Sequence, residues 1–94
     1  MKAVLRREIL YPTEQDNYIL RYYLLTDVQG ACGIRVIRSG GHDVVSERAD
    51  VFPLSNDKAY VLRMLTLLAD GTVPPCTLSE IVTDLIGSDA PNRP

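Results

Sequence analysis

Residues 17–26 read Asn-Tyr-Ile-Leu-Arg-Tyr-Tyr-Leu-Leu-Thr, a stretch in which two sets of side chains alternate. One set is Tyr18, Leu20, Tyr22 and Leu24, and the other is Ile19, Arg21, Tyr23 and Leu25. Successive side chains of a β-strand point to opposite faces of its sheet. We therefore expect a strand here, with the first set facing the core because only that set contains no charge.

Two adjacent glycines farther along the chain predict a hairpin. Gly40 and Gly41 separate two apolar-patterned runs, residues 31–39 and 42–52. A two-residue type I′ turn requires positive φ at both central positions, which glycine adopts without strain. The register set by this turn brings together Arg38 and Asp43, Ile37 and Val44, Val36 and Val45, Ile34 and Glu47, and Cys32 and Ala49. All are reasonable cross-strand pairs except the isoleucine with the glutamate, which could mark a bulge or an edge strand.

A further strand is expected at the start of the chain. Residues 3–11 mix Val, Leu and Ile with charged side chains, and Pro12 begins a polar, turn-rich segment that ends the run. Together these runs predict a four-stranded, mostly antiparallel sheet over residues 3–52.

The second half of the chain carries helix signals. Ser55 or Asn56 can cap a helix that runs to Asp70, and Gly71 is suited to the left-handed conformation that ends it. The following Pro74-Pro75 pair cannot continue a helix and predicts an extended crossing.

A second helix is expected after this crossing. Thr77 and Glu80 have the spacing of a capping box, and the apolar periodicity fades near Gly87. The predicted fold class is therefore α+β, a four-stranded, mostly antiparallel sheet followed by two C-terminal helices packed on one face. Residues 1–87 form one domain in this interpretation, and residues 88–94 form a flexible tail.

The first helix has an unusually wide apolar surface. At about 100° per residue, its apolar side chains spread over roughly 220°, against roughly 140° for the second helix. Only Ala59, Arg63, Thr66 and Asp70 are suited to water. The sheet can cover one side of such a helix, and either the second helix or another subunit must cover the other. If another subunit does so, the candidate interface is Tyr60, Val61, Met64, Leu67 and Leu68.

Composition bounds the class of protein. The chain has 94 residues, of which 46% are apolar and 23% charged, values typical of a single globular domain. The net charge of −2 gives no general attraction to nucleic acid or to anionic lipid. No secretory signal is visible, and no apolar run approaches the ~20 residues that a membrane span requires. We expect a cytoplasmic protein that does not bind membranes.

No residue pattern points to catalysis or to a bound cofactor. A nucleophile–base pair would need a histidine beside a serine or cysteine, but His42, the only histidine, is expected as a solvated residue at a hairpin tip. Glu80 and Asp84 are expected on a solvated helix face. Cys32 and Cys76 are interpreted as two small buried apolar residues, because a zinc site needs about four ligands. We therefore expect no enzyme activity, no metal and no cofactor.

A nucleic-acid-binding sheet is an alternative interpretation. Arg21, Tyr23, Arg35 and Arg48 should share the outward face of the sheet, where arginine could neutralise phosphate and tyrosine could stack on bases. We favour the simpler interpretation of a solvated face whose charges discourage edge-to-edge pairing.

Three stretches resemble a known family. They are Tyr22-Tyr23-Leu24-Leu25, then Cys32-Gly33-Ile34-Arg35-Val36, and above all Thr72-Val73-Pro74-Pro75-Cys76-Thr77-Leu78, which Ile81, Val82 and Asp84 follow. They are similar to a family of short proteins of clostridia-like Gram-positive anaerobes, known as a domain of unknown function. The resemblance covers roughly residues 2–86. It implies a bacterial cytoplasmic protein with strands first and helices last, and it assigns no activity and no functional residues.

The sequence therefore names no molecular function. Its wide apolar helix favours a small cytoplasmic protein-interaction or regulatory module that self-associates, most simply as a homodimer, or that binds a small protein partner. Nucleic acid is the less favoured partner.

Overall fold

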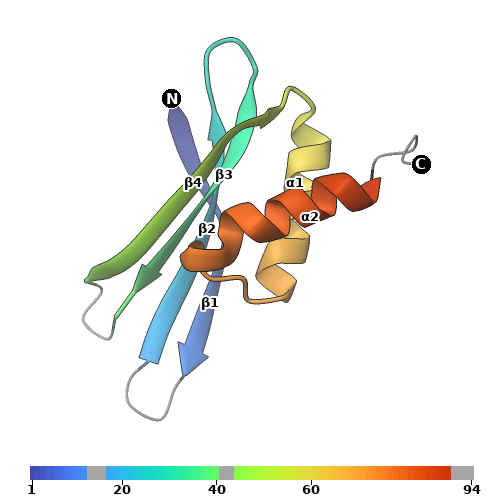
Figure 1. The fold of residues 1–94 in the computed structure, drawn as a ribbon. Helices are drawn as coiled ribbons and strands as arrows, with labels where there is room; N and C mark the ends of the chain where they lie inside the picture. Colours follow the sequence, from blue (N-terminus) through green and yellow to red (C-terminus); the bar gives the residue numbers. More distant parts are fainter. Residues whose placement is uncertain (13–16, 41–43, 90–94) are drawn as a thin grey trace.

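A computed structural model of the chain describes residues 1–12, 17–40 and 44–89. In chain order its elements are β1 (Lys2–Pro12), β2 (Asn17–Thr26), β3 (Cys32–Ser39), β4 (Val45–Ser55), α1 (Lys58–Asp70), the 3₁₀ turn η1 (Pro75–Thr77) and α2 (Leu78–Asp89) (Figure 1). The predicted α+β class, with a four-stranded antiparallel sheet before two C-terminal helices, is confirmed.

The four strands form one antiparallel meander in the order β1-β2-β3-β4. β2 has the predicted bounds, and Leu20, Tyr22 and Leu24 are buried on its inner face as the alternation predicts. Leu25 belongs to the outer set but is also fully buried. It pairs with Gly33 of β3, next to the point where the end of β4 folds onto the sheet.

The predicted two-residue turn at Gly40-Gly41 is wrong. The Gly40 amide donates a hydrogen bond to the Val44 carbonyl oxygen at 2.8 Å, and Ser39 pairs with Val45. The connection is therefore longer than two residues, and residues 41–43 within it, including Asp43 of the predicted pair with Arg38, lie outside the described part.

The β3–β4 register consequently differs from the predicted one. Each β3 residue from 34 to 38 meets a β4 residue four positions farther along than expected, so that Ile34 pairs with Val51 and Arg35 with Asp50. This register replaces the unfavourable isoleucine–glutamate pair with an apolar pair and aligns opposite charges. The shift is even in number, so it leaves every side chain on its predicted face.

β4 extends to Ser55, beyond its predicted end at Phe52, and its register shifts beside Gly33, between the pairs Ile34–Val51 and Cys32–Ser55. A Cβ atom at position 33 would lie 2.7 Å from a ring carbon of Phe52 and would overlap the Val51 carbonyl oxygen. Only glycine therefore fits where the Phe52 ring lies on β3.

Helix α1 ends at Asp70 as predicted, but its N-cap is Asp57 rather than Ser55 or Asn56, and the left-handed residue at its end is not Gly71. The Asp57 carboxylate accepts from the Tyr60 amide, and Ser55 accepts from the Asp57 amide instead of capping the helix itself. At the other end Gly71 has an ordinary φ of −88°, whereas Thr72 takes the left-handed φ of 49°. The Thr72 and Val73 amides then donate to the carbonyl oxygens of Ala69 and Leu68, the bonding of a Schellman motif.

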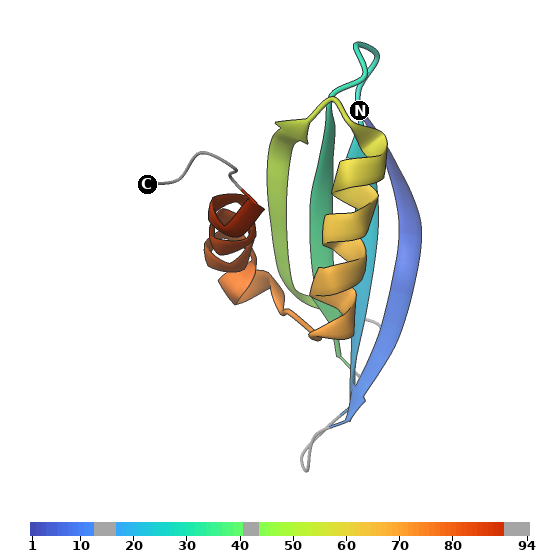
Figure 2. The same ribbon diagram turned by 90° about the vertical axis from the view of Figure 1, so that its right-hand side faces the viewer.

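The helices form the second layer of a thin molecule with extents of 45 × 33 × 16 Å. α1 runs along the inner face of the sheet, and α2 packs on the edge strand β4 (Figure 2). Both helices contribute to one core, whose buried members are Leu20, Tyr22, Leu24, Cys32, Ile34, Val36, Val61, Met64, Leu65, Leu68, Ala69, Leu78 and Val82.

The second helix is slightly longer than predicted. α2 reaches Asp89, two residues past the expected end at Gly87, so the first two residues of the predicted tail are helical. The rest of that tail, residues 90–94, lies outside the described part of the chain.

Candidate functional site

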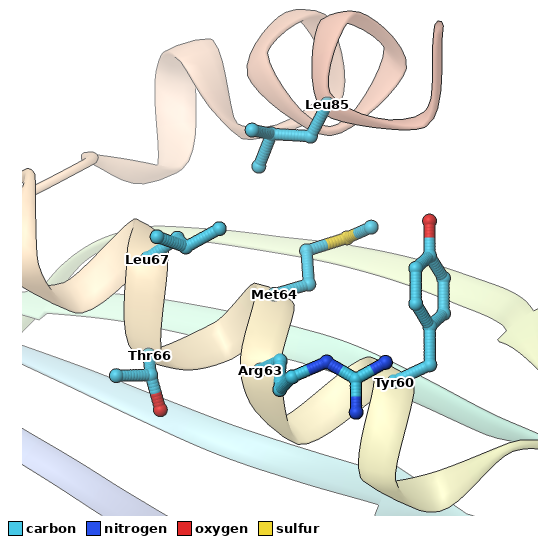
Figure 3. Close-up of a pocket in the computed structure, with 6 residues that line it drawn as sticks. All are labelled: Tyr60, Arg63, Met64, Thr66, Leu67 and Leu85. Carbon is cyan, nitrogen blue, oxygen red and sulfur yellow. The ribbon is translucent and has the colours of Figure 1, made fainter. Parts of the chain in front are cut away.

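A groove lies between α1 and α2. Its volume is about 630 Å³. Five α1 residues and one α2 residue line it, namely Tyr60, Arg63, Met64, Thr66, Leu67 and Leu85 (Figure 3). Tyr60, Met64 and Leu67 project from α1 toward α2, where Leu85 points back at them.

Helical spacing places these side chains together. Tyr60 and Met64, like Arg63 and Leu67, are separated by four residues, a spacing that puts side chains one above the other on the same flank of a helix. Met64 is only 3% exposed and forms the floor of the groove, whereas Leu67 is 58% exposed and stands at its rim. The groove therefore combines a buried apolar floor with an accessible apolar rim.

The predicted interface is divided by the fold. Val61 and Leu68 are buried in the core at 0% and 1% exposure, so they cannot contact a partner and do not belong to an interface. Tyr60, Met64 and Leu67 do line the groove. The predicted interface was centred on Val61 and Leu68, which are buried in the core. The accessible part of the helix surface, at Leu67, lies to one side of these two residues.

Sequence reasoning missed three lining residues. Arg63 and Thr66 were assigned to the water-facing strip of the first helix, and Leu85 of the second helix was not singled out. The spacing of four residues between Arg63 and Leu67 was a usable signal. Leu85 carried none, because the angle between two helices is not visible in their sequences.

Arg63 supplies a positive charge at the groove. Its guanidinium carbon lies 6.0 Å from the centroid of the Tyr60 ring, at the limit of a cation–π contact. Among the described residues no carboxylate lies within ion-pair distance of it. The site is thus an apolar groove beside one exposed cation.

Comparison with known families identifies the chain. Residues 1–88 match the family of unknown function DUF6514. The chain belongs to this family. The expected membership in a family of unknown function is therefore confirmed. Searches of the curated proteins and of the solved structures found no match.

The predicted nucleic-acid face of this DUF6514 chain does assemble on the outer side of the sheet. Tyr23 pairs with Arg35, and Ile37 lies between Arg21 and Arg48. Each arginine also has an acidic neighbour: Arg21 bonds to Glu8 at 2.7 Å, Arg35 to Asp50 at 2.9 Å and 3.1 Å, and Arg48 to Asp50 at 3.2 Å.

These ion pairs change the electrostatics of that face. The hydrogen bond from Arg35 is the main cause that holds the pKa of Asp50 below its ordinary value, and the same bond raises the pKa of Arg35. Three arginines thus face two carboxylates, so most of the positive charge that a phosphate backbone would need is already compensated.

One buried tyrosine links the sheet to the crossing between the two helices of the groove. Tyr22 is fully buried in the sheet, and its hydroxyl donates to the Val73 carbonyl oxygen, in the crossing between α1 and α2, at 2.8 Å. Burial raises the pKa of Tyr22 to about 12, with a smaller opposing effect from Arg7. Arg7 in turn forms an ion pair with Asp70, the last residue of α1, at 3.1 Å.

Other chemistry-bearing residues of the DUF6514 chain lie apart. Within residues 1–12, 17–40 and 44–89, no three His, Cys, Asp or Glu side chains are grouped so that they could hold a metal ion. Cys32 is buried as predicted, but Cys76 is exposed on η1, which corrects the expectation of two buried cysteines. Glu80 and Asp84 are exposed on α2, and His42 lies outside the described residues. Neither described helix is both long and apolar enough to cross a bilayer.

Proposed function

We propose that this DUF6514 chain is a small, non-catalytic protein-interaction module of the bacterial cytoplasm that self-associates through the groove between α1 and α2. One observation carries the proposal: Leu67 is 58% exposed at the rim of an apolar groove whose floor, Met64, is buried. A second copy of the chain is the partner that the proposal commits to.

The argument rests on apolar surface left over after folding. The sheet and α2 together cover Val61, Leu65 and Leu68, but they leave Leu67 and part of Tyr60 accessible. Full burial of a leucine side chain is worth about 1.5–3 kcal/mol, so covering the exposed part of Leu67 would contribute about 1–2 kcal/mol. A partner that covers Leu67 would stabilise the complex by this amount, whereas Leu67 in the isolated chain stays in contact with water.

The outer sheet face supports a nucleic-acid partner less well. Its arginines form ion pairs with Glu8 and Asp50, and these ion pairs would have to break before the arginines could bind phosphate. The groove, in contrast, has an apolar rim with no partner among the described residues.

The test compares two leucines with similar exposure at different places. Leu67 lies at the groove and Leu10 lies on β1, on the outer side of the sheet, at 63% exposure. We expect the unmodified chain to sediment as a concentration-dependent dimer in the micromolar range. Leu67→Glu should sediment as a 10.5 kDa monomer, because a carboxylate at the rim would have to be desolvated in the interface. Leu10→Glu should remain dimeric.

Circular dichroism verifies that both variants fold. The proposal fails if the unmodified chain is a monomer at every concentration up to the millimolar range. It also fails if Leu10→Glu disperses the dimer and Leu67→Glu does not, because the interface would then lie on the sheet.

A further inference from the structure

The two helices that flank the groove carry opposite charges on their exposed sides. α1 presents Lys58 and Arg63, while the Asp70 at its end is already paired with Arg7. α2 contains no basic residue, and Glu80 and Asp84 are exposed one turn apart. The charge that α1 places at the groove is therefore basic, at Arg63, and the exposed charges of α2, at Glu80 and Asp84, are acidic.

We propose that two copies of the chain associate about a twofold axis with α2 of each copy lying along α1 of the other, so that Asp84 of each copy pairs with Arg63 of the other. This inference rests on the proposed self-association and names the arrangement of the two copies at that same groove.

Symmetry and charge select this arrangement. In a twofold interface, a contact between residues i and j is repeated as a contact between j and i. If α1 faced α1, the charges brought together would be those of Lys58 and Arg63, since Asp70 is already paired with Arg7, and if α2 faced α2 they would be those of Glu80 and Asp84. Such like-charge contacts oppose association. Of these three pairings, α1 against α2 is the one that brings unpaired opposite charges together, and symmetry then gives two such contacts.

The apolar side chains are placed to agree with the charges. Leu67 lies one helical turn beyond Arg63 on α1, and Leu85 directly follows Asp84 on α2. An Arg63–Asp84 pair therefore places Leu67 of one copy close to Leu85 of the other. The apolar contact lies toward the groove and the ion pair at its solvent edge, the usual division between the core and the rim of an interface.

The expected association is weak. Two helices of 13 and 12 residues offer a contact about 20 Å long, which is small beside the roughly 800 Å² per partner of a standard interface. A micromolar dimer that weakens as salt rises is the expected behaviour, because exposed ion pairs are screened.

Charge reversal tests the arrangement. Arg63→Glu and Asp84→Arg should each weaken self-association about tenfold or more, since each creates two like-charge contacts per dimer. The double variant Arg63→Glu/Asp84→Arg restores both ion pairs and should recover most of the lost affinity. Lys58→Glu makes the same charge change on α1 outside the groove lining and should have less than a threefold effect. Sedimentation at low salt measures all four dissociation constants.

Mixing the two single variants gives an independent measurement. In a heterodimer of Arg63→Glu with Asp84→Arg, both cross-subunit pairs are between opposite charges, whereas each homodimer has two repulsive pairs. Native mass spectrometry, which resolves the two masses, should show mainly the heterodimer. A statistical 1:2:1 mixture would overturn the arrangement.

The two proposals fail in different ways. If the double variant is weaker than either single variant while Leu67→Glu still disperses the unmodified dimer, the crossed arrangement is wrong and self-association through the groove stands. If the unmodified chain never dimerises, both proposals are wrong.

Discussion

The two faces of the sheet are built from the same four strands, yet different interactions cover them. On the inner face Leu20, Tyr22, Leu24, Ile34 and Val36 are at most 3% exposed beneath the helices. On the outer face ion pairs such as Arg35–Asp50 lie among partly exposed apolar side chains, including Leu5 and Leu10.

This difference shows where the stability of the fold resides. Burial of apolar surface contributes about 0.8 kcal/mol per methylene group, so each inner side chain is worth several exposed ion pairs, which contribute about 0–1 kcal/mol each. The inner face therefore holds the fold together, and the outer face affects stability little. Three measurements test this contrast, in order of decreasing effect.

The largest effect is expected for Ile34→Ala. Ile34 is fully buried between Leu24 and Val51, and its truncation should cost about 3 kcal/mol through lost burial and the cavity left behind. Urea denaturation measures the change in the free energy of unfolding. Ile37→Ala, the same substitution on the outer face of the same strand, should cost less than half as much. Equal costs at the two positions would contradict the contrast.

A smaller effect is expected for Tyr22→Phe. Removing the hydroxyl leaves the Val73 carbonyl oxygen without its 2.8 Å hydrogen bond and should cost about 1–2 kcal/mol near pH 7. Because the pKa of Tyr22 is raised to about 12 in the folded state, its contribution is complete below pH 10 and is lost as the pH rises from about 10 to about 12.

Denaturation between pH 9 and pH 12 therefore distinguishes the two proteins. The unmodified chain should lose stability more steeply with rising pH than the Tyr22→Phe variant does. If both follow the same slope, the buried hydroxyl does not retain its proton in the fold and the role assigned to its hydrogen bond is wrong.

The smallest effect is expected for the outer ion pair. A double-mutant cycle of Arg35→Gln and Asp50→Asn should give a coupling of about 0.5 kcal/mol at low salt, because both side chains are partly exposed. The pKa of Asp50 is lowered, so this contribution is present above the ordinary value of 3.8 and is lost as the pH falls through the lower folded-state pKa. A coupling above 2 kcal/mol that 1 M NaCl does not reduce would show that the outer face contributes as much as the inner one.

The comparison also shows which parts of the molecule were predictable. The alternation in residues 17–26 gave the bounds of β2 and three of its buried side chains, Leu20, Tyr22 and Leu24, but it did not predict the burial of Leu25. The four water-facing residues of α1, Ala59, Arg63, Thr66 and Asp70, are all exposed as predicted. These features depend on the period of side chains along one element, which the sequence displays directly.

The errors have a common physical origin. The Gly40-Gly41 turn and the cap at Gly71 were inferred from glycine, which permits a left-handed conformation but does not require it. At the end of α1, Thr72 takes that conformation, and its amide and that of Val73 complete the bonding of the helix end. In the β3–β4 hairpin the connection is longer than the predicted two residues, and with this longer connection Ile34 pairs with Val51 and Arg35 with Asp50.

The sequence by itself determined the order of strands and helices, the inner and outer sets of side chains, and the excess of apolar surface on α1. The tertiary structure alone decided which part of that surface stays accessible. The angle between α1 and α2 depends on contacts such as Tyr22 with Val73, whose residues are far apart in the chain. Burial of Val61 and Leu68 and exposure of Leu67 follow from that packing, because neighbouring positions on one helix meet different neighbours in space.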